Sequence, residues 1–566
     1  MFFRIIAFLC SVSVSAALLL SCKSTPQDIT VITDAELSEA SVIPLDFDVD
    51  DYYRPYPDAV TVDLSLGEPE TVTSSGAYRY SGVLENGSIT VNADKTADEG
   101  TVYIILDNAH ITSPSPVNIT EAKKVVIILE DSSVNTLTQT FTDTAQDIPD
   151  AALYSKADLT ITGKGSLDVI SEHNDGINSR DDLKITGGNI TVTSVGDGIV
   201  GKDAVYIENG VFTVNAGKDG IRSTNTESEK GFTAIYGGTF NVTSVDDCIQ
   251  SAQDIYIENG IFTLTSGGGY NGITATPNDN MGIFGEKPQG GFQRGERPQS
   301  MPEGQIPPDF ENGGFKRGER PQSMPEGELP PDFENREFPK NKMPQSIPRE
   351  NATVTDTTEQ DSNTPKAINC EGKLNITGGS FEISSSHDAV SAKGDIALGG
   401  GKFDITAGDD GIHSDSCITA DGGEIIINNC YEGLEAQNIT VNSVKADIIS
   451  ADDGINVNVS GGVFTMNGGE ISISAGGDGI DSNGRIILNS GSIIIDVSKT
   501  GRADTPIDCQ TGYENNGCTV TDTYGNAVTV SNMSGHGGFG TRYKGNMPDR
   551  KQNTDTPVAV VGNNKT

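Results

Sequence analysis

The chain has 566 residues, a formal net charge of −42, no Trp and 66 Gly. A surface with this charge repels nucleic acid and anionic head groups, which excludes nucleic-acid binding, and it repels an acidic polysaccharide unless a cation mediates. Scarce aromatic residues are unusual for a packed globular enzyme, whereas a stack of repeated coils does not need them.

The first residues predict an exported protein that is anchored by a lipid to the bacterial cell envelope or surface. Residues 5–20 form an apolar run that is too short for a membrane span, so residues 1–21 are expected to be a signal peptide. The run ends in LLSC, which resembles the lipobox of bacterial lipoproteins and makes Cys22 the lipidated residue. The alternative is a plain secretory signal with a chance cysteine. Residues 22–60 are expected to form a polar tether.

Residues 71–140 are rich in predicted strands but lack a fixed register. The stretch VYIILDNAHITSPSPVNITEAKKVVIILEDSSVNTLTQT at 102–140 contains two apolar runs. We expect it to form a cap and the first coils of a fold that covers residues 61–275.

An Asp-Gly-Ile motif then recurs along the chain. Its aspartates at 175, 197 and 219 are separated by 22 residues each, which is typical of a repeat architecture. Segments such as GGNITVTS (187–194) precede the motif, and their alternation of apolar and polar residues indicates short half-buried strands. Strands of three to five residues, each followed by a turn and closing after about 22 residues, predict an all-β fold, a right-handed parallel β-helix with coils about 4.8 Å apart.

Equivalent residues of such coils form ladders along the stack. The Ile after each Asp-Gly is expected in one core ladder, made of Ile177, Ile199, Ile221, Ile249, Ile412, Ile455 and Ile480. A second ladder is expected from Phe212, Phe240, Phe262, Phe381 and Phe403. The Gly of the motif is expected to adopt a positive φ where the chain turns a corner.

Residues 276–365 interrupt the repeat. RGERPQSMPEGQIPPDFENGGFK at 294 recurs as RGERPQSMPEGELPPDFENREFP at 317, and this Pro- and Gly-rich composition is typical of disorder. The register resumes near Lys366, so we expect a disordered insertion between two coils, followed by further coils over 366–545 and a flexible tail over 546–566.

The aspartates of the motif have two competing interpretations. The first is an Asx turn, in which Asp accepts hydrogen bonds from its own corner; Asn271, in the degenerate copy YNGITA, fits this, and Asp388 and Glu432 occupy the same place in other copies. The second is Ca²⁺ binding, because carboxylates stacked ~5 Å apart repel by about 3 kcal/mol at an effective dielectric constant of ~20, and Ca²⁺ prefers oxygen ligands. The candidate metal ligands are Asp175, Asp197, Asp219, Asp246, Asp247, Asp409, Asp410, Asp452, Asp453 and Asp478.

Six cysteines lie outside the export segment: Cys248, Cys370, Cys417, Cys430, Cys509 and Cys518. They lack the C-x-x-C spacing of a zinc site. Export permits disulfides, and Cys509 with Cys518 is the candidate local pair.

Residues 70–545 resemble the bacterial β-helix family named carbohydrate-binding domain-containing proteins. The resemblance rests on AKKVVIILEDSSVNTLT at 122–138, on the G-G-x-F coils with Asp-Gly-Ile corners, and on the Pro- and Gly-rich insertion. It implies a fold similar to that of pectate lyases, an association with calcium, and binding of acidic and cellulosic polysaccharides without established catalysis.

Three functions therefore compete. The first is a lipoprotein that binds a polysaccharide, such as a polyuronate or cellulose, non-catalytically through Ca²⁺. The second is a calcium-dependent lyase of the pectate type, which needs a Lys or Arg base; Lys218 and Arg222, beside Asp219, are the candidates, with solvated surface charges as the alternative. The third is a structural or adhesive envelope protein.

Overall fold

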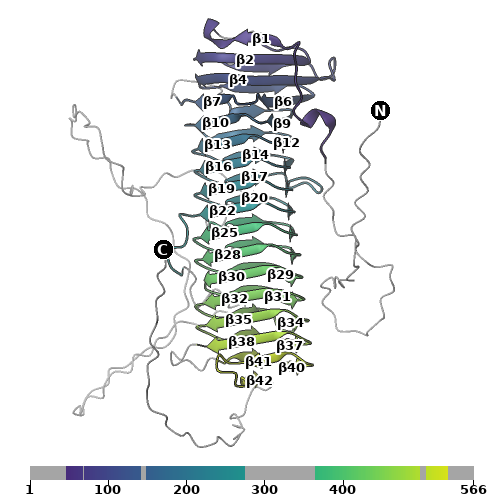
Figure 1. The fold of residues 1–566 in the computed structure, drawn as a ribbon, viewed down its shortest axis with the longest axis vertical. Coiled ribbons are helices and arrows are strands. Elements are labelled where there is room, and N and C mark those ends of the chain that lie inside the picture. The colour runs from purple at the N-terminus through teal and green to yellow at the C-terminus, as the bar shows by residue number, and fades with distance from the viewer. Residues whose placement is uncertain are drawn as a thin grey trace, which may run out of the picture. The chain divides into compact units, whose positions relative to one another are not determined.

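A computed structural model describes residues 46–67, 69, 71–141, 148–273, 364–497 and 505–532. These residues form an all-β parallel solenoid of about 15 turns with a spacing of about 23 residues (Figure 1), which confirms the predicted fold class. The two helices in this part are single 3₁₀ turns, η1 (Val49–Asp51) and η2 (Leu64–Leu66). No helix within the described ranges has the length and apolar character to cross a membrane. The predicted signal peptide and Cys22 lie outside these ranges.

Each turn contributes strands to three parallel ladders. The first ladder contains β3 (Ile89–Asn92), β5 (Val117–Glu121), β8 (Ala151–Ser155), β11 (Asp175–Ser179), β14 (Ile199–Gly201), β17 (Ile221–Ser223), β20 (Ile249–Ser251), β23 (Ile368–Cys370), β26 (Val390–Ala392), β29 (Ile412–Ala420), β31 (Leu434–Val441), β33 (Ile455–Val457), β36 (Ile480–Ser482), β39 (Ile507–Cys509) and β42 (Val530–Asn532).

The second ladder contains β1 (Val60–Asp63), β2 (Gly76–Glu85), β4 (Thr101–Ser113), β6 (Lys124–Leu129), β9 (Asp158–Gly163), β12 (Asp182–Ile185), β15 (Ala204–Ile207), β18 (Phe232–Ile235), β21 (Ile255–Ile257), β24 (Leu374–Ile376), β27 (Ile396–Leu398), the ends of β29 and β31, β34 (Val463–Met466), β37 (Arg485–Leu488) and β40 (Gly512–Asn515).

The third ladder contains the ends of β2 and β4, β7 (Val134–Gln139), β10 (Ser166–Ser171), β13 (Asn189–Ser194), β16 (Val211–Ala216), β19 (Thr239–Ser244), β22 (Ile261–Ser266), β25 (Ser380–Ser385), β28 (Lys402–Ala407), β30 (Glu424–Asn429), β32 (Lys445–Ser450), β35 (Glu470–Ala475), β38 (Ser492–Val497) and β41 (Thr519–Thr521).

The core consists of the predicted ladders. The motif isoleucines are fully buried and pair in register along the first ladder, as Ile199 does with Ile177 and Ile221. The five phenylalanines stack face to face along the third ladder, with ring centroids 4.7 Å apart for Phe212 and Phe240. Because each inward residue packs on its equivalents in the turns above and below, one continuous apolar column stabilises the whole solenoid.

The prediction for the motif glycine is wrong. Gly176, Gly198 and Gly220 are absent from the positive-φ residues of the described chain, whereas Gly188, the second residue of a Gly-Gly pair, has φ 107°. The motif glycine is required by close approach instead: a Cβ on Gly176 would lie 2.2 Å from a Val192 methyl carbon and 2.8 Å from the Gly198 carbonyl oxygen. The repeat therefore turns its corner without a left-handed residue and uses glycine to let turns pack closely.

The solenoid continues directly across the interruption in the repeat. In β20, Ile249 pairs with Ile368 of β23, which confirms that the register resumes near Lys366. Asn271 was expected to occupy the Asp position of this turn, but Lys366 holds that position, because its backbone N–H is the one that bonds to the Asp247 carboxylate. Residues 274–363, with nearly all of the predicted disordered insertion, lie outside the described residues.

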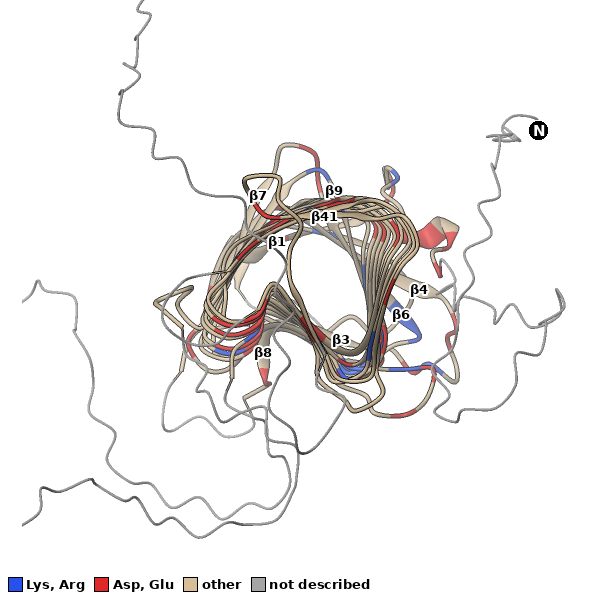
Figure 2. Cartoon of the chain, turned by 90° about the horizontal axis from the view of Figure 1, so that it is seen from below, with Lys and Arg blue, Asp and Glu red and all other residues tan. Residues whose placement is uncertain are grey.

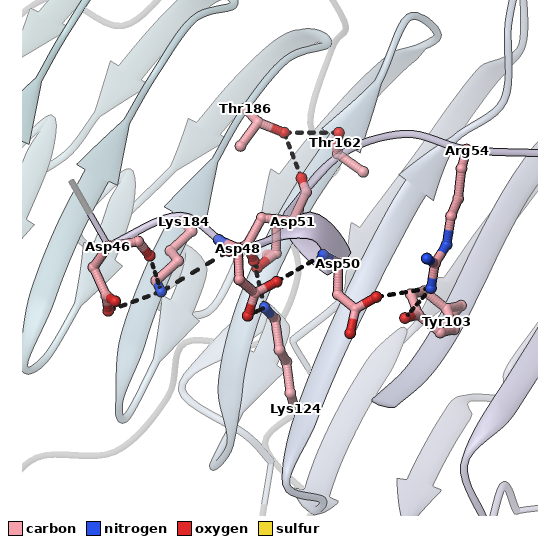
Figure 3. A network of polar contacts seen from close by, with 11 residues as sticks. Asp46, Asp48, Asp50, Asp51, Arg54, Tyr103, Lys124, Thr162, Lys184 and Thr186 are labelled. Atoms are coloured by element: carbon pink, nitrogen blue, oxygen red, sulfur yellow. Dashed lines mark hydrogen bonds and ion pairs between the residues drawn. The ribbon is translucent and has the colours of Figure 1, made fainter. Parts of the chain in front are cut away.

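Part of the predicted tether packs against the solenoid. We call residues 46–56 the N-terminal strap. Its Asp51 is fully buried and lies 2.7 Å from Lys124 Nζ of β6, and its Asp46 carboxylate lies 2.9 Å from Lys184 Nζ of β12 (Figure 3). The Phe47 ring packs edge-on against Tyr206 of β15. Residues 46–56 thus belong to the fold, because two lysines of the second ladder pair with strap carboxylates.

The candidate disulfide does not form. Cys509 lies in the first ladder and Cys518 directly precedes β41 of the third ladder, and both are free, buried thiols. Proximity in sequence therefore does not predict a disulfide here, because the two cysteines belong to different faces of one turn.

Candidate functional site

Acidic residues recur at one corner of the coils, beside β8 in Figure 2. We call the Asp slot the position two residues before the first inward residue of each first-ladder strand. From β11 to β39 it is occupied by Asp175, Asp197, Asp219, Asp247, Lys366, Asp388, Asp410, Glu432, Asp453, Asp478 and Thr505. The repeat thus brings side chains far apart in sequence into one row, as predicted for the aspartates.

Most aspartates in this row hold the backbone of the next turn. Oδ1 of Asp175 accepts a hydrogen bond of 3.0 Å from the backbone N–H of Asp197, whose Oδ1 accepts one of 3.0 Å from Asp219. The same contact recurs from Asp219 to Asp247 at 2.9 Å and onward to Lys366 at 2.8 Å. This arrangement is not an Asx turn, because the donor belongs to the neighbouring turn.

The backbone ladder explains why a side chain is needed there. The N–H groups of Gly176 and Ile177 donate to carbonyls of the next turn, those of Asp197 and Gly198. The slot N–H, one residue earlier, points back to the preceding turn and bonds to a carboxylate oxygen there. A buried N–H without a partner is destabilising, so the Asp slot completes the backbone hydrogen bonds of the corner.

Substitutions at Asp247 test this structural role. Asp247→Ala leaves the N–H of Lys366 without its acceptor, so we expect the free energy of unfolding to fall by about 1–3 kcal/mol. Asp247→Asn keeps an oxygen at the same place and should lose clearly less stability. Urea unfolding of both variants in chelator makes the comparison. Equal losses for the two variants would contradict the assignment.

The second carboxylate oxygen meets a donor at most slots. The donors come mainly from the position three residues after the slot, which faces outward beside it in the first ladder. Asn178 Nδ2 lies 2.7 Å from Asp175 Oδ2, and Asn369 Nδ2 lies 2.7 Å from Asp247 Oδ2. Asn456 Nδ2 lies 2.7 Å from Glu432 Oε2. Local hydrogen bonds therefore satisfy acids that were expected to need a cation.

Stacking nevertheless raises the pKa values of slot carboxyl groups, as the predicted repulsion requires. Burial, followed by the charges of Asp247 and Asp197, raises the pKa of Asp219 to about 8. Burial and Asp197 raise the pKa of Asp175 to about 6. Lys366 interrupts the row, since its Nζ lies 3.2 Å from Asp388 Oδ2. The slots thus form two acidic stretches, one on each side of Lys366.

The doubled acids of the motif do not share the slot. Asp246, Asp409 and Asp452 precede it and are half-buried. Of their partners, Asp247 and Asp410 are almost fully buried and Asp453 is half-buried. The hydroxyl of Tyr431 donates to Asp452 Oδ2 over 2.8 Å. Within the described ranges, Asp409 also falls in a group with Asp388 and Asp410 whose carboxylate oxygens lie within 4.8 Å of one another.

A further group of carboxylates lies in the C-terminal turns. We call Asp478, Asp481 and Asp508 the C-terminal acidic cluster, because one oxygen of each lies within 4.8 Å of the others. All three are half-buried, and Asp508 Oδ1 is buried without a hydrogen-bond partner among the described residues. Burial and the charges of Asp478 and Asp508 raise the pKa of Asp481 to about 6.

Sequence reasoning found Asp478 and missed its two partners. Asp481 and Asp508 occupy the outward position three residues after the slot, and they pair in register in β36 and β39. The turn that contains the segment TPIDC at 505–509 is not recognisable from the motif, because Thr505 and Pro506 replace its Asp and Gly. A tabulation of the residue after the motif Ile would have revealed both aspartates.

The two residues proposed as a lyase base behave differently. Arg222 is half-buried, and its Nη1 lies 3.5 Å from Asp197 Oδ2 and 3.2 Å from Asp219 Oδ2. Two carboxylates at these distances favour the charged guanidinium, which disfavours a role as a base. Lys218 is exposed.

Comparison with known proteins identifies the family. A family model described as "Carbohydrate-binding domain-containing protein" matches residues 67–411 and 409–536. The chain belongs to this family. The family model begins near β1 and ends just after β42, so it covers every ladder of the solenoid. This confirms the resemblance predicted from the sequence.

One relative within the carbohydrate-binding domain-containing family comes from Acetivibrio thermocellus. It is described by the family name and is 41% identical over 136 residues, which are 23% of this chain and 46% of the relative. The match thus spans about half the length of that relative. A solved structure, described as the structure of the polysaccharide lyase-like protein from C. thermocellum in a gadolinium derivative, matches 35% of this chain and 82% of that chain, with 38% identity and a TM-score of 0.33.

The residues of the C-terminal acidic cluster fit a Ca²⁺ ion. Ca²⁺ takes oxygen ligands only, and the cluster offers carboxylate oxygens alone. Among the described residues, no Lys, Arg or His forms an ion pair with Asp481 or Asp508. The N-terminal slots fit less well, because asparagine side chains and Arg222 already contact their carboxylates.

Proposed function

We propose that this protein binds an acidic polysaccharide without cleaving it and that Ca²⁺ on the C-terminal acidic cluster takes part in the binding. The observation that carries the proposal is the cluster itself, in which Asp508 Oδ1 is buried without a hydrogen-bond partner among the described residues. Family membership supports carbohydrate binding. The net charge of −42 supports a role for a cation, since an uncompensated surface would repel an acidic polymer.

The chemistry that the ion supplies is simple. A Ca²⁺ ion bound by three carboxylates retains coordination positions for further oxygens, such as those of a glycan carboxylate. This chain's residues hold the ion: Asp478 through its place in the slot, and Asp481 and Asp508 through adjacent strands. A uronate polymer suits this surface better than cellulose, which carries no carboxylate.

Retention on insoluble polysaccharide tests the proposal. We expect the wild-type chain to be retained on pectate in Ca²⁺ and released by EGTA, with weaker retention on cellulose. The double variant Asp481→Asn with Asp508→Asn should lose retention to the level seen in EGTA. Its matched control, Asp447→Asn with Asp496→Asn, removes two exposed carboxylates from the third ladder of the same region and should bind like wild type.

The outcomes separate the parts of this proposal. Absence of retention on both polymers in Ca²⁺ would reject polysaccharide binding by this chain. Retention that survives EGTA would reject the role of Ca²⁺. Release of unsaturated uronide, measured by absorbance, would favour the lyase over a binding protein.

We also propose that a lipid on Cys22 holds the protein at the bacterial cell envelope. The apolar run before LLSC supports this location. The variant Cys22→Ser should move from the detergent phase to the aqueous phase in detergent partitioning of cell extracts. An unchanged distribution between the phases would contradict the anchor.

A further inference from the structure

His413 in β29 lies among acidic side chains from two turns. Its Nδ1 is 3.0 Å from Asp410 Oδ2 and 3.0 Å from Glu435 Oε2. Asp410 and Glu435 are each 4% exposed, whereas the His413 ring is partly accessible. Two carboxylate oxygens and one imidazole nitrogen therefore converge at one point of the first ladder, and Asp410 among them occupies the Asp slot.

We propose that Asp410 Oδ2, His413 Nδ1 and Glu435 Oε2 form a second cation site, which binds a divalent transition metal such as Zn²⁺. The site is separate from the C-terminal acidic cluster and does not rest on the proposed function. Its remaining coordination positions, on the accessible side of the ring, are open to water or to a ligand.

The distances match a coordination shell. Ligand atoms about 2.1 Å from an ion lie about 3.0 Å apart at neighbouring octahedral positions and about 3.4 Å apart at tetrahedral ones. Both contacts of His413 Nδ1 have the shorter of these lengths. The three ligand atoms all lie within 4.8 Å of one another, so an ion fits among them with small side-chain movements.

The surroundings hold two of these ligands in position. Nε2 of His413 lies 3.1 Å from Asp415 Oδ1, so the ring can keep its proton on Nε2 and present Nδ1 as a ligand. The Asn458 amide donates to Glu435 Oε1 over 2.9 Å, which leaves Oε2 toward the ring. A carboxylate behind the ligating histidine and a hydrogen bond on the ligating carboxylate are typical of metal sites.

The donor set selects the class of ion. An imidazole nitrogen suits Zn²⁺, Cu²⁺, Fe²⁺ and Ni²⁺, whereas Ca²⁺ and Mg²⁺ take oxygen ligands. Two carboxylates and one imidazole provide two negative charges for one divalent cation, in a place where Asp410 and Glu435 are buried. Glu432 and Asp388, in the slots on either side of Asp410, add further negative potential.

Metal binding to the full chain, stripped with chelator, tests the inference without any glycan. We expect one tightly bound Zn²⁺ per chain by metal analysis after dialysis, undiminished by excess Ca²⁺. Co²⁺ in the same site should give visible absorption bands typical of coordination by one nitrogen ligand. His413→Gln should abolish the bands, and Asp415→Asn should weaken binding about 10–100-fold.

Two controls keep the test decisive. His387→Gln removes a half-buried histidine from the preceding turn and should leave Co²⁺ binding intact. The double variant Asp481→Asn with Asp508→Asn should also keep Co²⁺ binding. A failure of the Zn²⁺ proposal is therefore distinguishable from a failure of the proposed Ca²⁺-dependent polysaccharide binding. Each variant is first shown to be folded by its circular dichroism. Absence of stoichiometric Zn²⁺, or equal Co²⁺ binding by His413→Gln and wild type, would overturn the proposal.

Discussion

The free energy of unfolding of the metal-free protein should fall steadily as pH is raised from about 5 to about 9. The cause is the stacked carboxyl groups of the Asp slot. Burial raises the pKa of Asp219 to about 8, that of Glu432 to about 9 and that of Asp453 to about 8, in each case together with neighbouring carboxylates. In the unfolded chain these groups titrate near pH 4.

The direction of this pH dependence follows from the number of protons that the folded and unfolded chains bind. Between pH 4 and the raised pKa values the folded chain holds more protons than the unfolded chain, so raising the pH favours unfolding. Their contribution is complete below pH 4 and is lost as pH rises through about 8. Each unit of pKa difference corresponds to about 1.4 kcal/mol, so a few such groups outweigh most single contacts.

Other groups act in the opposite direction at low pH. Hydrogen bonds and the charge of Lys124 outweigh burial and lower the pKa of Asp48, and His413 lowers the pKa of Asp415. Groups with a lowered pKa stabilise the fold above their unfolded pKa and lose this contribution as pH falls. We therefore expect maximal stability at mildly acidic pH.

Chemical unfolding in EDTA across this pH range provides the measurement. Asp219→Asn retains the acceptor for the Asp247 N–H but cannot ionise, so its pH dependence should be flatter than that of wild type. Asp447→Asn, which changes an exposed carboxylate in β32 away from the slots, is the matched control. Stability that rises from pH 6 to pH 9 would contradict the argument.

The sequence predicted the solenoid well because its information is repeated. The motif isoleucines and the stacked phenylalanines each recur at a fixed distance from Asp-Gly, and every copy supports the same register. The conformation of Gly176 was mispredicted for a physical reason. Sequence composition cannot distinguish a glycine that needs a positive φ from one that needs space for the turn beside it.

The candidate site was only partly predictable. Periodicity placed Asp175, Asp197 and Asp219 in one row, but it could not show that each carboxylate bonds to the backbone of the next turn. The outward position beside the slot varies from Asn178 to Arg222 to His413, so no repeat marks it. The side chains at this outward position determine which slot carboxylates have a hydrogen-bond or ion-pair partner. Their pairing with particular slots follows from the register of the turns, which the structure provides.

Substituting Lys124 by Met should release the N-terminal strap from the solenoid. Lys124 Nζ lies 2.7 Å from Asp51 Oδ1 and 3.0 Å from Asp48 Oδ2. Asp51 is fully buried, and its other basic neighbour, Lys184, lies 4.0 Å away. Removing one partner of a buried ion pair costs about 3–5 kcal/mol, because the other charge stays buried without compensation.

The strap can detach from the solenoid and so avoid leaving the Asp51 charge buried without a partner. If residues 46–56 detach, the Asp51 carboxylate regains water, and the loss is limited to the strap's own contacts, such as Phe47 on Tyr206 and the hydrogen bond from Thr186 to the Asp51 carbonyl. The ladders of the solenoid do not depend on these contacts. We therefore expect local release, with the main unfolding transition nearly unchanged.

Chymotrypsin cleavage after Tyr52 and Tyr53 reports this release. A change of about 3 kcal/mol in docking raises the population of the open strap more than a hundredfold, so cleavage should become at least that much faster in Lys124→Met. Lys123→Met makes the same chemical change at an exposed neighbour and should cleave like wild type. Adding Asp51→Asn to Lys124→Met removes the stranded charge, so the double variant should regain much of the protection. Equal cleavage of Lys124→Met and Lys123→Met would show that the buried pair does not hold the strap in place.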